Sequence, residues 1–299
     1  MNTATNIPAS IHQKILNKAI AEQRVFNELL QYFAIERFLL RLGESRYGKK
    51  FVLKGSFVFL AWQVPLTRPT RDMDFLGFTE NTIQNLVLIV KEICIQSVEN
   101  DGIEYDPDSV TGEIIKEEAD YQGIRITFLA YLGKARIHMR LDVGFADIVT
   151  PPPENVEIPT ILDNMQKPYV RAYPPETVIA EKFQTMVYLG KINSRMKDFY
   201  DLWFMAKKMK FDFDLVYRAI RNTCEQRKTQ IPETLPFSIS EEFAHEKQSQ
   251  WTSFLKKNQI DTAPQNFIDV VQILRIFFTP FILQKEYPPH HWYPEMGWE

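Results

Sequence analysis

Two aspartates that could bind a metal ion, Asp72 and Asp74, stand two residues apart in the segment 71–78, which is RDMDFLGF. The apolar residues of this segment predict a β-strand, in which residues i and i+2 point to the same face. Both carboxylates therefore share one face, while Met73 and Phe75 point the other way, toward a core. Carboxylates held so close repel unless a cation lies between them, and Mg²⁺, often bound by one or two carboxylates plus substrate phosphates, is the natural cation. Two solvent-facing acids at the start of a strand would give the same pattern.

A third aspartate, Asp142, lies in a later segment, 135–145, in which polar and apolar residues alternate. The alternation predicts a strand whose polar face carries Arg136, His138, Arg140 and Asp142. Asp142 could complete a two-metal site with the first pair, or it could be an ordinary solvated acid. Asp147 competes for this role, but its odd separation from Asp142 puts it on the other face unless a bulge intervenes. Asp142 is therefore preferred, and His138 is a weaker candidate on the same face.

A tight turn, Lys54-Gly55-Ser56, joins an apolar run at 51–53 to a second apolar segment at 57–62. This order predicts a strand, a turn and the start of a helix. Glycine permits close approach of the backbone to a ligand, and the first N–H groups of a helix can bind an anion. A plain tight turn fits the same residues, so the turn indicates a phosphate site only in combination with the aspartates.

Two predicted helices further along the chain carry a lysine and two more aspartates. Lys182 lies at the edge of the apolar stripe of the helix 176–189, where a partly desolvated ammonium favours an anionic partner such as a phosphate. The same position suits a surface lysine that buries only its stem. Asp198 and Asp201 share a face of the next helix. A structural ion pair between the two halves of the chain explains them as well as catalysis does.

Four sequence stretches carry a resemblance to a known family. They are LKGS at 53–56, RPTRDMDF at 68–75, PETVIAEKF at 175–183 and RMKDFYDL at 195–202. Together they resemble the AbiEii/AbiGii toxin family of nucleotidyltransferases, which includes the MenT toxins. The chain departs from the family pattern at Ser56, where many members have glycine, and at Thr70, where serine is usual and threonine can make the same hydrogen bond.

The resemblance implies an α+β fold of the DNA polymerase β type, a mixed sheet with flanking helices, followed by a helical C-terminal domain. It implies Mg²⁺-dependent transfer of a nucleoside monophosphate from an NTP to an acceptor hydroxyl, with an antitoxin protein as partner and with tRNA as the expected acceptor. A toxin–antitoxin pair and a phage-defence system are the two settings implied. The metal ligands would be Asp72, Asp74 and Asp142, and the catalytic set would add Lys182, Asp198 and Asp201. The nucleotide would be held by Lys54, Gly55, Ser56, Thr70 and Arg71.

The charge of the chain is unevenly distributed, although its net charge is only −3. Eight basic and two acidic residues occupy 36–71, and eleven basic and five acidic residues occupy 182–228. If these segments meet in space they can form an anion site suited to RNA; otherwise they are ordinary solvated helix faces. The apolar segment 267–283 contains Asp269 and Arg275 and so predicts a buried helix, not a membrane span. With no basic and apolar leader, the protein is expected in the cytoplasm, without membrane attachment.

The domain organisation follows from the prolines at 151–153, which no helix or sheet interior accepts. We expect a nucleotidyltransferase domain with N-terminal helices at 1–150, a proline-rich linker at 151–172, a helical domain at 173–286 and a tail at 287–299 that is ordered only by docking. Further strands are expected at 110–115 and 124–131. Further helices are expected at 10–42, 81–95, 212–225, 239–257 and 267–285.

Two other classes of function remain open from the sequence. A metal-dependent glycosyltransferase also uses an Asp-x-Asp pair, but it leaves the Gly-Ser turn and the late helix motif unexplained. A non-catalytic nucleotide-binding module would keep the fold with a broken metal site, against which the three aspartates argue.

Overall fold

The computed structural model describes residues 6–62, 72–116, 122–283 and 289–299, and the chain forms two compact units. The first unit comprises Met1–Ala146 with Pro153–Tyr173, and the second comprises Asp147–Pro152 with Pro174–Glu299. Each unit has its own core, and they are described separately below.

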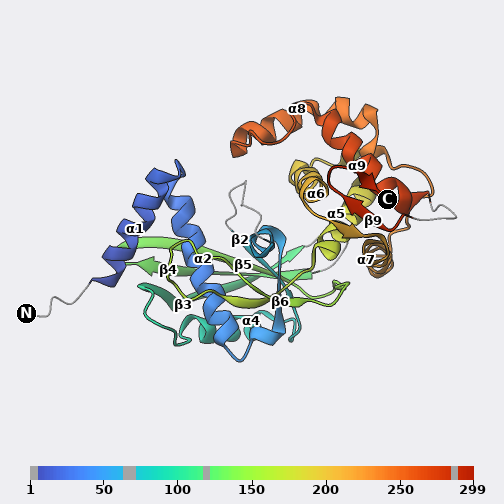
Figure 1. Cartoon of the computed structure of the whole chain (residues 1–299). Coiled ribbons are helices and arrows are strands. Elements are labelled where there is room, and N and C mark those ends of the chain that lie inside the picture. Colours follow the sequence, from blue (N-terminus) through green and yellow to red (C-terminus); the bar gives the residue numbers. More distant parts are fainter. Residues whose placement is uncertain (1–5, 63–71, 117–121, 284–288) are drawn as a thin grey trace, which may run out of the picture. The chain divides into compact units, whose positions relative to one another are not determined.

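The first unit is built on a mixed seven-stranded sheet with the strand order β3-β4-β5-β2-β1-β7-β6 (Figure 1). The strands are β1 Phe51–Lys54, β2 Asp72–Gly77, β3 Ile103–Lys116, β4 Gln122–Leu132, β5 Ala135–Gly144, β6 Glu154–Glu157 and β7 Tyr169–Ala172. The β2–β5 and β1–β7 pairs are parallel, and the other pairs are antiparallel. The expected α+β class with a mixed sheet is confirmed.

Helices α2 (Phe26–Glu44) and α4 (Ile83–Cys94) cover the apolar face of this sheet, and α1 (Ile7–Ala21) packs on α2. Phe38 of α2 lies 5.1 Å from Phe128 of β4, measured between ring centroids. A Cβ built at Gly112 of β3 would contact Ile83 of α4, so glycine lets this helix approach the sheet closely. The apolar residues of β5 are buried, while Arg136 and His138 between them are exposed. The polar face predicted for β5 is therefore present.

Helix α2 carries three charged residues into the core. Arg41 donates to both oxygens of Asp101, at 2.7 and 3.0 Å, and Arg37 lies 2.5 Å from Glu36. Both arginines belong to the basic segment 36–71, and both are buried with acidic partners. This segment therefore offers less positive surface than its sequence suggested.

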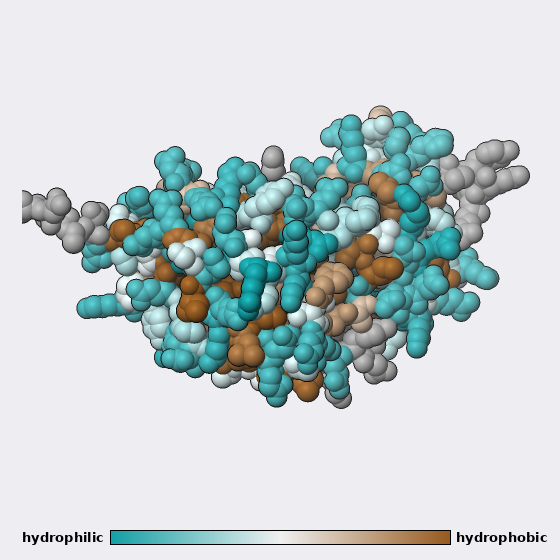
Figure 2. All heavy atoms as spheres, turned by 90° about the horizontal axis from the view of Figure 1, so that it is seen from below, coloured by the Kyte–Doolittle hydropathy of each residue, from teal (hydrophilic) through white to brown (hydrophobic). Residues whose placement is uncertain are grey.

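The second unit contains helices α5 to α9 and a small sheet of order β10-β9-β8 (Figure 1). The helices are α5 Pro175–Leu189, α6 Met196–Lys208, α7 Phe213–Gln226, α8 Glu241–Asn258 and α9 Phe267–Ile282, and the strands are β8 Phe211–Asp212, β9 His291–Tyr293 and β10 Gly297–Trp298. Along α9, Phe267, Leu274 and Phe281 are fully buried, as expected for a helix of the core. No helix among the described residues has the length and apolarity needed to cross a membrane. On the face shown in Figure 2, apolar residues are scattered among hydrophilic ones.

The segment expected to be a linker, 151–172, instead supplies strands β6 and β7 to the first sheet. Leu53 of β1 pairs with Ala172, and β6 pairs with β7 beyond it. Both strands have only four residues, and three of the four residues of the edge strand β6 are exposed, so neither shows a long apolar alternation. The C-terminal tail does dock on the body: Trp292 is 3% exposed, and its Nε1 donates to the carbonyl of Ala206 at 2.7 Å.

The buried Glu36 makes the stability of the first unit depend on pH. Burial raises the pKa of Glu36 from 4.5 to about 7, although Arg37 and the Ile161 amide, which donates to its carboxylate, lower it. Between about pH 4.5 and 7, the folded chain therefore binds a proton that the unfolded chain has released. The stabilisation that this proton gives the folded state is complete below about pH 4.5 and is lost as the pH rises through 7. We expect the stability of the wild type relative to Glu36→Gln to fall by roughly 3 kcal/mol across this range. Urea unfolding of both proteins at several pH values measures the difference.

Glu44→Gln is the matched control, because Glu44 is an exposed acid on the same helix. Its stability should follow that of the wild type at every pH. A Glu36→Gln variant with the same pH profile as the wild type would contradict the shifted pKa.

Candidate active site

The predicted carboxylates lie on two neighbouring parallel strands. In the β2–β5 register Asp74 pairs with Asp142, and Asp72 pairs with Arg140. Because paired residues of adjacent strands point to the same face about 4.8 Å apart, the side chains of Asp74 and Asp142 lie next to each other. Asp72 shares that face two residues earlier, so the first unit brings all three expected aspartates onto one polar surface.

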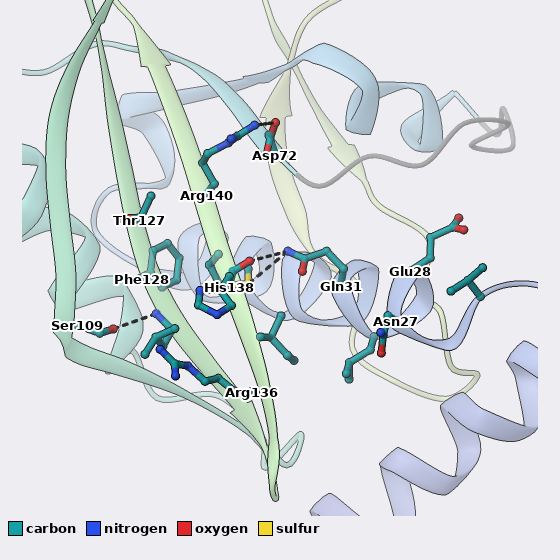
Figure 3. A pocket seen from close by; sticks show the side chains of 15 residues that line it. Asn27, Glu28, Gln31, Asp72, Ser109, Thr127, Phe128, Arg136, His138 and Arg140 are labelled. Atoms are coloured by element: carbon teal, nitrogen blue, oxygen red, sulfur yellow. Dashed lines mark hydrogen bonds and ion pairs between the residues drawn. The ribbon is translucent and has the colours of Figure 1, made fainter. Parts of the chain in front are cut away.

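Arginines from adjacent strands bind two of these carboxylates. Arg140 of β5 donates to Asp72 (Figure 3), and Arg125 of β4 donates through Nε and Nη2 to the two oxygens of Asp142, each at 2.8 Å. The hydrogen bonds to Asp142 raise the pKa of Arg125 above its ordinary value. The repulsion between the carboxylates is thus offset by fixed cations of the same sheet.

The Lys54-Gly55-Ser56 turn lies against the same carboxylates. Lys54 pairs with Asp74 across the antiparallel β1–β2 ladder. Gly55 has a φ of +71°, and a Cβ there would come within 2.9 Å of the carboxyl carbon of Asp74. Glycine is required here both by its backbone conformation and by the close approach of the carboxylate. The turn continues into the 3₁₀ turn η2 (Gly55–Phe57) and the four-residue helix α3 (Val58–Ala61).

The arrangement of the acids limits the metal sites that they can form. No group of three or more His, Cys, Asp or Glu residues able to hold a metal ion occurs in the part of the chain that the structure describes. Two neighbouring carboxylates, Asp74 and Asp142, are nevertheless a donor set that Mg²⁺ uses when substrate phosphates complete its coordination. The residues therefore fit a Mg²⁺ ion held jointly with a nucleotide and do not form a closed all-protein site.

The second unit brings together Lys182, Asp198 and Asp201. The Lys182 Nζ lies 2.6 Å from Oδ1 of Asp198 and 2.9 Å from Oδ2 of Asp201, which links α5 to α6. Arg195 adds a contact of 2.5 Å to the other oxygen of Asp198. Burial alone would raise the pKa of Asp198, but Lys182 and Arg195 outweigh it and hold the pKa well below its ordinary range. The cluster is an ion-pair network within this unit.

The remaining predicted site residues differ in whether the structure describes them and in how exposed they are. Thr70 and Arg71 lie outside the described residues. Ser56 is half-buried and His138 is exposed. Asp147 follows the end of β5 and lies 2.6 Å from Arg227 in the second unit, so it is not part of the carboxylate row.

Sequence reasoning gave no role to the two arginines that bind the carboxylates. A signal for Arg140 existed, because the alternation already put it on the face of Asp142. Arg125 could be found only with the register that pairs it with Asp142. Strand register is a property of the folded sheet, and it is not visible in either segment alone.

Comparison with known proteins identifies the family. The family model described as the nucleotidyl transferase AbiEii toxin of type IV toxin–antitoxin systems matches residues 37–273. The chain belongs to this family. The predicted resemblance is confirmed, and the chain is a nucleotidyltransferase of the AbiEii toxin family.

Two solved structures are distantly similar to this chain. The structure of JHP933 from Helicobacter pylori has a TM-score of 0.44 and 17% identity, over 84% of this chain and 90% of that one. A second H. pylori structure, a proposed nucleotidyltransferase, has a TM-score of 0.44 and 16% identity, over 92% of this chain and 96% of that one. No curated protein matches the chain. The assignment to the AbiEii family therefore depends on the family model.

Gly55→Ala tests the contact between the turn and the carboxylates in this AbiEii chain. The methyl group must displace the Asp74 side chain, so we expect nucleotidyl transfer to fall about 10²-fold, the usual cost of misplacing a reacting group by about 1 Å. The positive φ adds a stability loss of about 1–2 kcal/mol. Single-turnover kinetics and thermal unfolding measure the two effects.

Gly133→Ala is the matched control, because Gly133 has a φ of +59° and its added Cβ would make only an ordinary contact at 3.6 Å. It should lose similar stability and keep its activity. Equal activity losses in both variants would show that strain, and not contact with Asp74, explains the effect.

Lys182→Ala tests the ion-pair network of the second unit. Removing Lys182 leaves two carboxylates that are 5 and 6% exposed without their shared ammonium, which destabilises a protein by about 3–5 kcal/mol. The denaturant midpoint should therefore fall. The control is Lys191→Ala, whose ion pair with Glu246 is exposed and whose midpoint should not change. An unchanged midpoint for Lys182→Ala would remove the structural role.

Proposed function

We propose that this AbiEii chain is a Mg²⁺-dependent enzyme that transfers a nucleoside monophosphate from an NTP to an acceptor hydroxyl and releases pyrophosphate. The observation that carries the proposal is the in-register pair Asp74 and Asp142, with Gly55 closely packed against Asp74. A nucleotidyltransferase needs carboxylates beside a backbone turn that phosphates can approach, and this surface has both.

Each candidate site residue of the first unit that the structure describes has a role in this reaction. Asp74 and Asp142, with Asp72, would hold Mg²⁺, which when bound neutralises charge on the phosphates and activates the attacking hydroxyl. Gly55 lets the backbone of the turn pack against Asp74, and the Ser56 hydroxyl donates a hydrogen bond to the terminal phosphates. Lys54 offsets the charge that develops on the phosphoryl oxygens.

The bond changes follow from in-line displacement. The acceptor oxygen attacks the α-phosphorus, the bond from that phosphorus to the bridging oxygen breaks, and pyrophosphate leaves with the electron pair. The proton of the attacking hydroxyl passes to the carboxylate of Asp142. Arg125 holds that carboxylate through two hydrogen bonds and so fixes the direction from which the hydroxyl approaches.

For Lys182, Asp198 and Asp201, the catalytic role stays a prediction of the family resemblance. The side chain of Lys182 is 17% exposed, so its ammonium can contact an anionic phosphate while both aspartates hold its position. The nucleotide-binding roles of Thr70 and Arg71 remain predictions of the family resemblance.

The biological setting is proposed from the family and the charge. We propose tRNA as the acceptor, an antitoxin protein as the partner, and a cytoplasmic location, where NTPs and tRNA occur. A role in phage defence belongs to the same proposal. Exposed basic residues of α6 and α7 support an RNA acceptor, whereas the buried Arg37 and Arg41 do not.

A transfer assay tests the proposal. The protein is incubated with each labelled NTP, Mg²⁺ and total tRNA, and label on RNA is measured. We expect label with the wild type and a loss of about 10²-fold or more with Asp74→Asn and Asp142→Asn, because each removes a charge needed at the phosphoryl group. Chelation of Mg²⁺ should abolish transfer, and added Mg²⁺ should restore it.

Asp163→Asn is the control, because Asp163 is an exposed acid of the first unit and is absent from this surface. It should label RNA as the wild type does. Equal labelling by the wild type and the Asp74 and Asp142 variants would contradict the proposal.

A further inference from the structure

A second pocket of the first unit, of about 660 Å³, lies where helix α2 ends. Its walls are formed by the end of α2, by the segment that joins α2 to β1, and by strands β6 and β7. A Cβ built at Gly43 would come 2.5 Å from the carbonyl oxygen of Tyr169, so glycine is needed for α2 to pack this closely on β7. Pockets that bind small molecules have volumes of roughly 300–1,000 Å³, so this one has room for a nucleotide-sized ligand.

This pocket is separate from the carboxylates. It lies before the start of β1, whereas the Lys54-Gly55-Ser56 turn follows the end of that strand. The amide of Phe78, the residue after β2, donates to the carbonyl of Lys50 at 2.7 Å, so the far end of β2 lies on the same side as the pocket. Asp74 precedes Phe78 by four residues, which is about 13 Å along an extended strand. No residue of the proposed reaction site lines the pocket.

The charge of the pocket is positive. Arg46, Lys49 and Arg171 line it, and the lining residues that the structure describes include no aspartate or glutamate. Arg46 lies 2.8 Å from Glu92, whereas Lys49 and Arg171 have no acidic partner within the described parts of the chain. The C-terminal end of α2 adds only about half a negative charge. The pocket therefore favours an anionic ligand.

Arg171 is held in position by contacts that leave most of its donors available. Its Nη1 donates to the carbonyl oxygen of Lys49 at 2.8 Å, and its guanidinium carbon lies 5.8 Å from the centre of the Phe78 ring. A guanidinium fixed in this way can bind two oxygens of one phosphate, and little further side-chain entropy is lost when it does. The ammonium of Lys49 adds a second cation at the same pocket.

An exposed aromatic ring lies beside these cations. Tyr169 is 58% exposed and shares a face of β7 with Arg171, because the two residues are separated by one position along the strand. Asn155 pairs with Arg171 across the β6–β7 ladder, and its side-chain amide has no hydrogen-bond partner among the described residues. An exposed ring beside cations can stack on a nucleobase, and a free amide can both donate to and accept from the edge of the base.

We propose that this pocket binds a phosphorylated nucleoside at a site separate from the carboxylates. The phosphate contacts Arg171 and Lys49, the base stacks on Tyr169, and the amide of Asn155 binds the edge of the base. Such a ligand has two sources with the same chemistry, a free nucleotide or one nucleotide of an RNA strand. The inference goes beyond the proposed nucleotidyl transfer and does not depend on it.

Binding of a nucleotide without catalysis tests the proposal. A fluorescent AMP that carries its label on the ribose is titrated with the full chain in EDTA, and anisotropy is measured. The double variant Lys49→Gln, Arg171→Gln should bind about tenfold more weakly or worse, because both charged phosphate contacts are lost. Tyr169→Leu should bind about fivefold more weakly, because the stacked ring is lost. Asp74→Asn should bind as the wild type does, since Asp74 is remote from the pocket.

Competition distinguishes the two sources of the ligand. Unlabelled AMP, inorganic phosphate and a single-stranded RNA of about ten nucleotides are each used to displace the fluorescent AMP. If the ligand is a free nucleotide, AMP displaces it at a lower concentration than the RNA does; if the ligand is a nucleotide of RNA, the order is reversed. Either order supports the site. Displacement by inorganic phosphate at the same concentration as AMP would overturn the assignment to a nucleoside.

Lys134→Gln and Tyr188→Leu are the matched controls. Lys134 is an exposed lysine of the first unit outside this pocket, and Tyr188 of the second unit is 59% exposed. Both variants should bind the fluorescent AMP as the wild type does, and thermal unfolding should show that every variant is folded.

Lys49→Gln alone keeps the test decisive if the double variant does not fold, because the Lys49 side chain has no hydrogen bond or ion pair with any described residue. Unchanged binding by both Lys49→Gln and Tyr169→Leu would overturn the proposal. If the transfer assay detects no label on RNA, the proposed function fails, and this titration still decides whether the pocket binds a nucleotide.

Discussion

The parallel pairing of β2 with β5 is the constraint on which the rest of the first unit depends. It places Asp74 beside Asp142 and Asp72 beside Arg140, and a shift of one residue would turn one strand's polar side chains into the core. The close packing of Gly55 requires Asp74 at this position. Residues 135–139 of β5 have no described strand beside them on this side. One register therefore positions the carboxylates and the turn together.

The ion pairs of the two units differ in how easily they can be exchanged. Arg140 and Asp72 are 41 and 32% exposed, and such a pair contributes only about 0–1 kcal/mol, so a phosphate can replace Asp72 as the partner of Arg140 at little cost. Asp198 is 5% exposed and its pKa is held low by two cations, so removing either cation would destabilise the folded protein. The surface of the sheet is suited to exchange partners with ligands, whereas the Lys182 cluster is suited to hold one geometry.

The sequence predicted those features that depend on local pattern. The alternation around Asp142, the glycine turn and the amphipathic helices each appear within a few residues, and the family motifs identified the α+β nucleotidyltransferase class. Features that depend on partners far along the chain were missed. Strands β6 and β7 are four residues long and are stabilised by pairing next to β1, which no local periodicity reveals. The same holds for the contact between Arg125 and Asp142, since only the register of β4 brings the guanidinium to that carboxylate.

Charge is the clearest case of a property that sequence order describes poorly. The segment 36–71 is strongly basic, yet Arg37 and Arg41 pair with acids inside the core and add nothing to the surface. Strand β5 has no comparable cluster in sequence, but its period of two puts Arg136, His138 and Arg140 in one row on the solvent side. The electrostatic potential at the protein surface depends on which charged side chains share a face. A positive surface that could bind RNA is therefore predicted from strand periodicity and not from net charge along the chain. That row ends at Asp142, which pairs with Asp74 on the neighbouring strand and so connects the positive surface to the carboxylates.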